Sequence, residues 1–378
     1  MSDVLIYADT VRSPELRHEV PMTIVDPFLY VERDGVRHIV VSSMEIPLLA
    51  ELGGYELHPL EEFGLDELRR SGLPSSEIFD ELVVRAVREL GVEDATVPAT
   101  FPVLVADRLR AAGVELTPAR AAFDRRRRVK AKAELEGIRR AQTAAEAGMS
   151  AARDLLRRAR PNGAGLEVDG EPLTSERVKS AIRSAFLEHG ASCDAFIVSH
   201  GPQSAIGHHL GEGQIRAGEP ILIDIWPHDD LSTCSADMTR TFVVGDVPAE
   251  VRDWHRLSKQ ALDRALGDIR PGVTARSVFD AACDVFEGEG YPTQRTKPDG
   301  ETLTDGFFHS LGHGVGLEVH EEPLLGIAGA DELVAGDVLA IEPGLYRRGL
   351  GGCRLEDLVL VTDTGAEKLT SFPYELEP

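Results

Sequence analysis

The segment ILIDIWPHDDLSTCSADMTRTFVV, residues 221–244, is the most informative about the fold of the larger part of this chain. Both of its ends are rich in β-branched residues and predict strands, and residues 227–230 between them predict a turn. The segment therefore predicts a β-hairpin that brings Asp224 and Asp237 side by side. Two carboxylates held together in an apolar sheet repel each other unless a cation or a proton lies between them.

A second informative segment is FHSLGHGVGLEVHEEP, residues 308–323, which carries three histidines among glycines. Glycine lets the backbone approach another group closely, and neutral imidazole is a common ligand of Zn, Mn, Co and Fe. Three histidines within so short a stretch indicate a site rather than isolated polar residues. They are His309, His313 and His320.

Two further segments, VLAIEPGLY (338–346) and GGCRLEDLVLV (351–361), each interrupt an apolar run with a glutamate. Glu342 and Glu356 are therefore predicted to lie in a sheet interior, where a charge needs a partner. Arg354 lies two residues before Glu356 on the same strand face, so a salt bridge between them is the alternative to a metal site.

The four segments together supply two aspartates, one histidine and two glutamates from predicted strands. A set of mostly oxygen ligands with one nitrogen suits two divalent ions, such as Mn, Co or Zn, better than one structural zinc. Such a pair of ions lowers the pKa of a shared water and stabilises the charge that develops at an attacked carbonyl.

The helices around these segments follow a repeated plan. Apolar residues at steps of three and four predict helices over 135–156 and 178–186, and again over 251–269 and 278–286. Each helix pair leads into β-rich sequence, which predicts an internal duplication with helices covering one side of a shared antiparallel sheet and a site between the halves. The basic run at 125–128, just before the first helix, is predicted to be a solvated face.

The first 125 residues predict a separate, smaller α/β domain. LIYAD (5–9), MTIVDPFLYVERDGVRHIVVSS (22–43) and FPVLVAD (101–107) are interpreted as strands, and IPLLAEL (46–52) and EIFDELVVRAVREL (77–90) as helices. This part contains no cluster of residues with evident chemistry. We therefore expect it to have a structural or oligomerising role.

Composition narrows the class of protein. A length of 378 residues suits two domains, and the formal net charge of −24 opposes binding to nucleic acid. No apolar run approaches the roughly 20 residues needed to cross a membrane, and the amino-terminal sequence lacks the pattern of a secretory signal, so a cytoplasmic protein is expected. The four cysteines are far apart without CxxC spacing, which predicts neither a zinc knuckle nor a disulfide framework.

With these segments in order, residues 127–378 resemble the pita-bread metallopeptidases, the family of aminopeptidase P, prolidase, methionine aminopeptidase and the metal-free creatinase. The resemblance implies an α+β chain in which a pita-bread domain, with pseudo-duplicated helix pairs on a curved antiparallel sheet, follows a smaller α/β creatinase-type domain at 1–125. It is carried by SADMTRTF (235–242), HSLGHGVGLEVHEEP (309–323), AIEPGLY (340–346) and GCRLEDLVLVT (352–362).

Residue by residue, the resemblance implies a site for two divalent metal ions, with manganese expected first and cobalt or zinc as alternatives. Asp224 would bind one ion and Asp237 would bridge both. His313 and Glu342 would bind the second ion, and Glu356 would be the other bridge.

The resemblance also implies roles around the metals. His208, in GPQSAIGHHL (201–210), and His320 would orient the substrate and steady the tetrahedral intermediate, while Glu342 would carry a proton. His309, Tyr346 and Arg354 would surround the prolyl residue, with Arg354 among the catalytic groups.

Two departures from the family pattern lie at the hairpin. Trp226 stands where the family usually has glycine, and the interval between Asp224 and Asp237 is two residues longer than is common. Both changes can reshape the rim of the site, so Trp226 is expected to contact the substrate.

The expected function is hydrolysis of an Xaa-Pro bond, either at the amino terminus of peptides or in dipeptides. The expected partners are a proline-containing peptide and a second copy of the chain in a homodimer, with neither nucleic acid nor membrane. One alternative is a metal-dependent hydrolase or lyase of a small polar metabolite on the same fold, which Trp226 leaves open. Another is a catalytically silent binding protein, which the complete set of ligands disfavours. Methionine aminopeptidase fits less well because that type generally lacks the amino-terminal domain.

Overall fold

In the computed structural model, which describes residues 2–378, the chain divides into two units, Met1–Arg127 and Arg128–Pro378. We call them unit 1 and unit 2. Among the described residues, no helix has both the length and the apolar character needed to cross a membrane.

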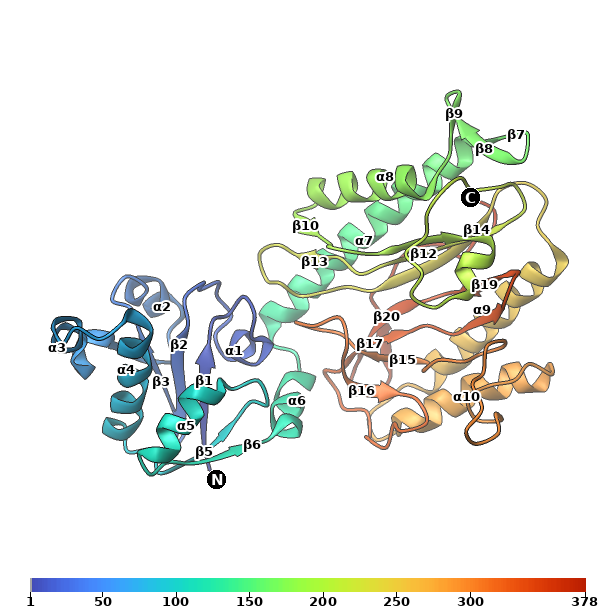
Figure 1. Ribbon diagram of the computed structural model, residues 1–378. Helices are drawn as coiled ribbons and strands as arrows, with labels where there is room; N and C mark the ends of the chain where they lie inside the picture. Colours follow the sequence, from blue (N-terminus) through green and yellow to red (C-terminus); the bar gives the residue numbers. More distant parts are fainter. Residues whose placement is uncertain (1) are drawn as a thin grey trace. The chain divides into compact units, whose positions relative to one another are not determined.

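Unit 1 is built on one mixed sheet with the strand order β4-β3-β2-β1-β5-β6 (Figure 1). The pairs β1–β2 and β2–β3 are antiparallel, and β1–β5, β3–β4 and β5–β6 are parallel. The strands are β1 (Asp3–Ala8), β2 (Phe28–Arg33), β3 (Val36–Val41), β4 (Glu56–Pro59), β5 (Asp94–Val97) and β6 (Glu115–Pro118).

Both faces of this sheet are covered by apolar cores, because successive side chains of a strand point to opposite faces. Leu5 belongs to one core and its neighbour Ile6 to the other. The helices of this part are α1 (Pro14–Glu19), α2 (Ile46–Leu52), the 3₁₀ helix η1 (Leu60–Phe63), α3 (Leu65–Arg70), α4 (Ser75–Glu89), α5 (Val103–Ala111) and α6 (Arg120–Arg128).

The strand predicted at 101–107 is wrong, because α5 begins at Val103, directly after Pro102. Its buried residues are Val105, Ala106 and Leu109, which lie on one face of a helix. A short apolar run does not by itself distinguish a strand from a buried helix, and here the spacing beyond residue 107 decides it.

The solvated face predicted for residues 125–128 is wrong in its second half. Arg125 is exposed, but Arg127 and Arg128 are buried. The guanidinium of Arg128 donates to both carboxylate oxygens of Asp337, at 2.9 and 2.7 Å. This buried pair supplies the counter-charge that a buried arginine needs.

Unit 2 has the predicted duplicated helix pairs, and Figure 1 shows one pair beside β12 and β14 and the other beside β15 and β17. In each half the second helix is capped by a threonine whose hydroxyl accepts from the third residue along, at Thr174 and at Thr274. The helices are α7 (Lys132–Arg158) with α8 (Ser175–Glu188), and α9 (Ala249–Asp268) with α10 (Ala275–Gly288).

The main strands of unit 2 form two antiparallel ladders, β11-β12-β14 and β16-β15-β17-β20-β21. The ladders adjoin where the backbone N–H of Glu356 donates to the carbonyl of Thr239 at 3.1 Å. Their strands are β11 (Ile197–His200), β12 (Pro220–Ile225), β14 (Met238–Val243), β15 (Gly312–Gly314), β16 (Glu321–Leu325), β17 (Val338–Ile341), β20 (Asp357–Val361) and β21 (Ala366–Lys368).

The remaining elements of unit 2 are short. β18 pairs with β19, β10 with β13, and β7, β8 and β9 form a small sheet after α7. Their bounds are β7 (Arg160–Asn162), β8 (Gly165–Val168), β9 (Glu171–Pro172), β10 (Ala191–Ser192), the 3₁₀ helix η2 (Gly201–Ala205), β13 (His228–Asp229), β18 (Gly344–Arg347) and β19 (Gly351–Arg354).

The hairpin predicted from residues 221–244 is confirmed. In its ladder Asp224 faces Thr239 and Ile225 faces Met238, so Asp237 lies one residue before β14 begins. The turn differs from the prediction, since residues 228–229 form β13 and the chain turns at 230–232. Within this longer connection β13 pairs with β10, and His228 forms a single bridge with Ser235.

Candidate metal centre

A cavity of about 210 Å³ in unit 2 gathers most of the residues that the sequence predicted for the site. Nine of the eleven predicted site residues line this cavity. The lining is completed by Ile197 and Val319, which were not predicted from the sequence. The nine are His208, Asp224, Trp226, Asp237, His313, His320, Glu342, Arg354 and Glu356.

His313 lies in the middle of a tightly packed strand, β15, between β16 and β17. A Cβ atom on Gly312 would lie 1.9 Å from the carbonyl oxygen of Ala340, and one on Gly314 would lie 2.3 Å from that of Glu322. Only glycine fits at either position without moving a neighbouring strand. The close approach that the glycines predicted is confirmed, and it fixes the backbone that carries His313.

The ring of His313 presents a bare nitrogen to the carboxylates. Its Nδ1 donates to the carbonyl oxygen of Gly314 at 3.0 Å, and burial, helped by His320, lowers its pKa to about 4. The neutral ring therefore keeps its proton on Nδ1, which leaves the Nε2 lone pair free. Nε2 lies 3.7 Å from Asp237 Oδ2 and 3.8 Å from Glu342 Oε1.

Three acidic side chains crowd around that nitrogen. Ligand atoms of Asp237, His313 and Glu356 all lie within 4.8 Å of one another. Burial and mutual repulsion raise the pKa of Asp237 and of Glu356 well above the ordinary range, and burial raises that of Glu342 to about 8. Within residues 2–378, buried Asp237 Oδ1 has no hydrogen-bond partner.

This donor set fits divalent cations. Among the described residues, Asp237 Oδ1 is buried without a hydrogen-bond donor, and the lone pair of His313 Nε2 points toward carboxylates. The acids around it have raised pKa values because they are buried and repel one another. A bound cation would satisfy all of these groups. Imidazole together with carboxylates suits Mn, Co or Zn. Asp224 and Glu342 line the same cavity and bring the number of candidate ligands to five.

Arg354 does not form the salt bridge with Glu356 that the sequence left open. Its Nη2 pairs with Asp224 Oδ2, and its Nε lies 3.7 Å from Glu342 Oε2. Glu356 Oε2 instead accepts from the hydroxyl of Thr239 at 2.7 Å. The positive charge in the cavity therefore faces the side of Asp224 and Glu342.

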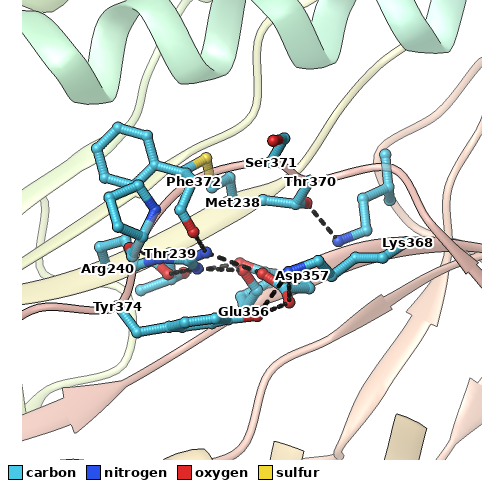
Figure 2. A network of polar contacts seen from close by, with 12 residues as sticks. Met238, Thr239, Arg240, Glu356, Asp357, Lys368, Thr370, Ser371, Phe372 and Tyr374 are labelled. Atoms are coloured by element: carbon cyan, nitrogen blue, oxygen red, sulfur yellow. Dashed lines mark hydrogen bonds and ion pairs between the residues drawn. The ribbon is translucent and has the colours of Figure 1, made fainter.

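A polar network behind Glu356 holds its backbone, as Figure 2 shows. Fully buried Arg240 donates to the carbonyl of Glu356 at 2.6 Å and to Asp357 Oδ1 at 2.9 Å. It also donates to the carbonyls of Phe372 and Pro373, at 3.0 and 2.9 Å, so the C-terminal segment lies on the same guanidinium. This network was not predicted from the sequence, although an arginine within a strand that also contains threonines and a valine is an unusual residue for a buried strand.

His309 and Tyr346, predicted to surround the prolyl residue, lie outside the cavity lining. His309 Nδ1 donates to the carbonyl of Ser310 at 2.7 Å, and burial lowers the pKa of this ring to about 3. Its bare Nε2 therefore accepts from the hydroxyl of Tyr346 at 2.9 Å, and that oxygen accepts from Arg354 Nη1 at 3.2 Å. The pair therefore holds the guanidinium of Arg354, and their predicted place around the prolyl residue stays a prediction.

The other predicted residues lie around the cavity. The ring of His320 meets that of His313 edge to face at 4.3 Å between centroids, and burial lowers its pKa. His208 follows η2 and is exposed. Trp226 directly follows β12, is half-buried and packs against Ile197, Leu222 and Tyr346.

Comparison with known proteins finds one matching family model and relatives that are named as dipeptidases. The family model described as metallopeptidase family M24 matches residues 136–363. The "Probable dipeptidase PepE" of Mycobacterium tuberculosis is 32% identical over 345 residues, which cover 90% of this chain and 82% of that protein. The "Xaa-Pro dipeptidase" of Pyrococcus furiosus is 32% identical over 251 residues, 66% of this chain and 64% of that one.

Solved structures share the whole fold. The dipeptidase PepE of Mycobacterium ulcerans, 26% identical, has a TM-score of 0.73 with coverage of 100% of this chain and 93% of that chain. The Xaa-Pro dipeptidase of Bacillus anthracis, 24% identical, has a TM-score of 0.78 with coverage of 100% and 94%. These likenesses confirm the fold that the resemblance implied.

Proposed function

The chain belongs to metallopeptidase family M24, and from that premise we propose that it hydrolyses Xaa-Pro bonds with two divalent ions held in the cavity of unit 2. The observation that carries the proposal is the convergence of His313 Nε2 with Asp237 and Glu356, whose ligand atoms lie within 4.8 Å of one another. Relatives named as dipeptidases and Xaa-Pro dipeptidases support the reaction class.

In this proposal Asp224 holds one ion, and His313 with Glu342 holds the other. Asp237 and Glu356 would bridge the two, as the resemblance implies, and both are buried carboxylates that lack a paired counter-charge among the described residues. Manganese is the proposed ion, with cobalt and zinc as alternatives of similar ligand preference. Bound ions of this kind lower the pKa of a water and polarise the scissile carbonyl.

Glu342 is the proposed proton carrier. A carboxylate positioned beside the attacking water can take up its proton and later release it, which is what a general base and acid requires. The proton would go to the prolyl nitrogen as the peptide bond breaks. Arg354 Nε lies 3.7 Å from Glu342 Oε2 and would help to orient this carboxylate.

His208 and His320 are the proposed positioning groups. Both line the cavity, and the lowered pKa of His320 keeps its imidazole neutral and able to donate one N–H to an oxygen of the substrate. His309 and Tyr346 hold Arg354 in place and, as the resemblance implies, would surround the prolyl residue of the substrate.

The volume of the cavity bears on substrate size. About 210 Å³ is below the roughly 300–1,000 Å³ of sites that take drug-sized ligands. The cavity therefore has room for a short part of a substrate, which is either a dipeptide or the amino-terminal end of a longer peptide. Trp226 on the cavity wall would limit the first residue of the substrate.

The domain roles, location and assembly are also proposed. Unit 1 would be the creatinase-type domain and unit 2 the catalytic domain. All four cysteines are free thiols, as is usual in a reducing compartment, which supports a cytoplasmic protein. A homodimer is implied by the resemblance, and light scattering of the purified protein tests it.

A substrate panel tests the function. Ala-Pro should be cleaved at least tenfold faster than Ala-Ala by protein loaded with Mn or Co, because a difference of one methylene is worth only about 1–3 kcal/mol and smaller preferences do not establish proline specificity. Ala-Pro-Ala separates dipeptidase from aminopeptidase activity. Failure on every Xaa-Pro substrate together with turnover of a small betaine would overturn the proposal in favour of a metabolite hydrolase or lyase.

Two variants refine the specificity part. Trp226→Gly should widen the range of accepted first residues and leave the metal content unchanged, because the indole lines the cavity without being a metal ligand. Trp226→Phe, which keeps an aromatic wall, is the matched control and should keep the wild-type range. Equal substrate ranges for all three proteins would remove Trp226 from substrate contact.

A further inference from the structure

Unit 1 contains a second cluster of metal-binding residue types, at the edge of its sheet. The edge strand β4 pairs in parallel with β3, with His38 opposite Glu56 and Val40 opposite His58. Because alternate side chains of a strand share a face and paired residues point the same way, His38, Glu56 and His58 project from one face. One ligand atom from each lies within 4.8 Å of the others.

The distances within the cluster suit one ion. His38 Nδ1 lies 3.1 Å from His58 Nε2 and 3.3 Å from Glu56 Oε2. Donors of a tetrahedral site with metal–ligand bonds of about 2.0–2.1 Å lie roughly 3.3 Å apart. Two ring nitrogens that face each other at this distance share either a proton or a cation.

A fourth residue fixes the orientation of one ring. His58 Nδ1 lies 3.0 Å from Glu62 Oε2, which comes from η1 just after β4. An ionised carboxylate only accepts, so His58 Nδ1 carries the proton and its Nε2 lone pair points at His38. A metal-bound histidine usually donates its other ring N–H to a carboxylate, as His58 does to Glu62. Glu56 and Glu62 together also balance the charge of a divalent ion.

We propose that His38, Glu56 and His58 bind one zinc or similar borderline divalent ion, with Glu62 as the outer partner of His58. Two imidazoles and one carboxylate are a donor set for such ions. The ion would join β4 to β3 and, through Glu62, hold η1. It would thereby secure the exposed edge of the sheet, where a short strand with one neighbour has few hydrogen bonds of its own.

Zinc stoichiometry of the whole chain tests the proposal. Metal-free wild-type protein, dialysed against buffered Zn²⁺ and measured by elemental analysis, should hold one zinc per chain more than His58→Ala. Ions in the cavity of unit 2 are common to both proteins and cancel in the difference. Glu62→Gln should keep the site but weaken it by about 10–100-fold, as is typical when an outer partner is lost.

The controls separate this site from the catalytic one. His189→Ala removes an exposed histidine at the end of α8 and should keep the wild-type zinc content. Cleavage of Ala-Pro should be the same in wild type, His58→Ala and His189→Ala, so this inference and the proposed peptidase activity stand or fall separately. If His58→Ala does not fold, Glu56→Gln, at a side chain that is 61% exposed, replaces it.

The change in melting temperature on addition of Zn²⁺ is a second test of the site. Added Zn²⁺ should raise the melting temperature of unit 1 in the wild type and not in Glu56→Gln, because a ligand that binds only the folded form stabilises it. Equal zinc content in wild type, His58→Ala and Glu56→Gln at every Zn²⁺ concentration would overturn the proposal. The two histidines would then be a hydrogen-bonded pair with a shared proton.

Discussion

Replacement of Arg240 by methionine tests the buried network that holds the backbone of Glu356 (Figure 2). The side chains of Arg240 and Asp357 are 1% and 0% exposed, and the pair is joined at 2.9 Å. Removal of one partner from a buried pair costs about 3–5 kcal/mol, because the other charge remains buried. Asp357 would keep the hydroxyl of Tyr374 and Lys368 at 3.7 Å, so the lower end of that range applies.

The expected loss is therefore about 3 kcal/mol in the free energy of unfolding of unit 2, or roughly 6–12 °C in its melting temperature. Urea unfolding followed by tryptophan fluorescence measures it, since both tryptophans, Trp226 and Trp254, lie in unit 2. The variant should also bind metal more weakly, because Arg240 donates to the backbone carbonyl of Glu356.

An exposed ion pair in the same unit is the matched control. Arg139 and Glu367 are about half exposed and 2.8 Å apart, and Arg139→Met should cost no more than about 1 kcal/mol. Arg240→Met combined with Asp357→Leu should recover part of the loss, because the unpaired charge disappears. If Arg240→Met lost no more stability than Arg139→Met, the buried pair of Arg240 and Asp357 would not contribute the stability assigned to it here.

Three further predictions concern the cavity. Glu356→Ala should hold fewer than two divalent ions per chain by elemental analysis, because it removes a proposed bridge. His320→Ala should lower kcat on Ala-Pro by a factor on the order of 10²–10⁴ with unchanged metal content, as for a positioned acid-base or electrostatic group. In metal-depleted protein the melting temperature should fall as the pH rises from about 5 to about 8, because the stabilisation from protonated Glu342 is complete below about pH 4.5 and is lost as the pH rises through its pKa of about 8.

Each of these three has a distinct contrary outcome. Two tightly held ions in Glu356→Ala would exclude a bridging role. Loss of metal together with activity in His320→Ala would place that ring among the ligands, and full activity would remove it from the mechanism. In the pH series Glu342→Gln is the control and should flatten the slope, while a slope equal to that of the wild type would assign the effect to other groups.

Much of this molecule could be predicted from local sequence. The hairpin at 221–244 and the four amphipathic helices of unit 2 follow from periodicity and β-branched content, which report local backbone preference and burial. The glycines beside His313 predicted a close backbone approach, and the strand around them has it. Carboxylates inside apolar runs predicted that Glu342 and Glu356 need a partner, and both line the cavity.

Other features depended on contacts between residues that are far apart in the chain. Arg128 and Asp337 lie 209 residues apart, so the basic run gave no sign that its last arginine would be buried and paired. Arg354 lies two residues from Glu356 but pairs with Asp224, 130 residues away. Spacing along the sequence indicates which face of a strand a side chain lies on, but it does not identify the residue that the side chain contacts.

Contacts between distant residues also determine the positions of several polar side chains. His309 and Tyr346 lie 37 residues apart in the chain, and the fold joins them in a hydrogen bond that also holds Arg354. His38 and His58 lie on different strands, and only the parallel register of β3 and β4 brings them to 3.1 Å. The sequence indicates which chemical groups are available and which secondary structure each segment forms. A binding site also requires specific distances between those groups. These distances are set only when the strands pair and the helices pack against them.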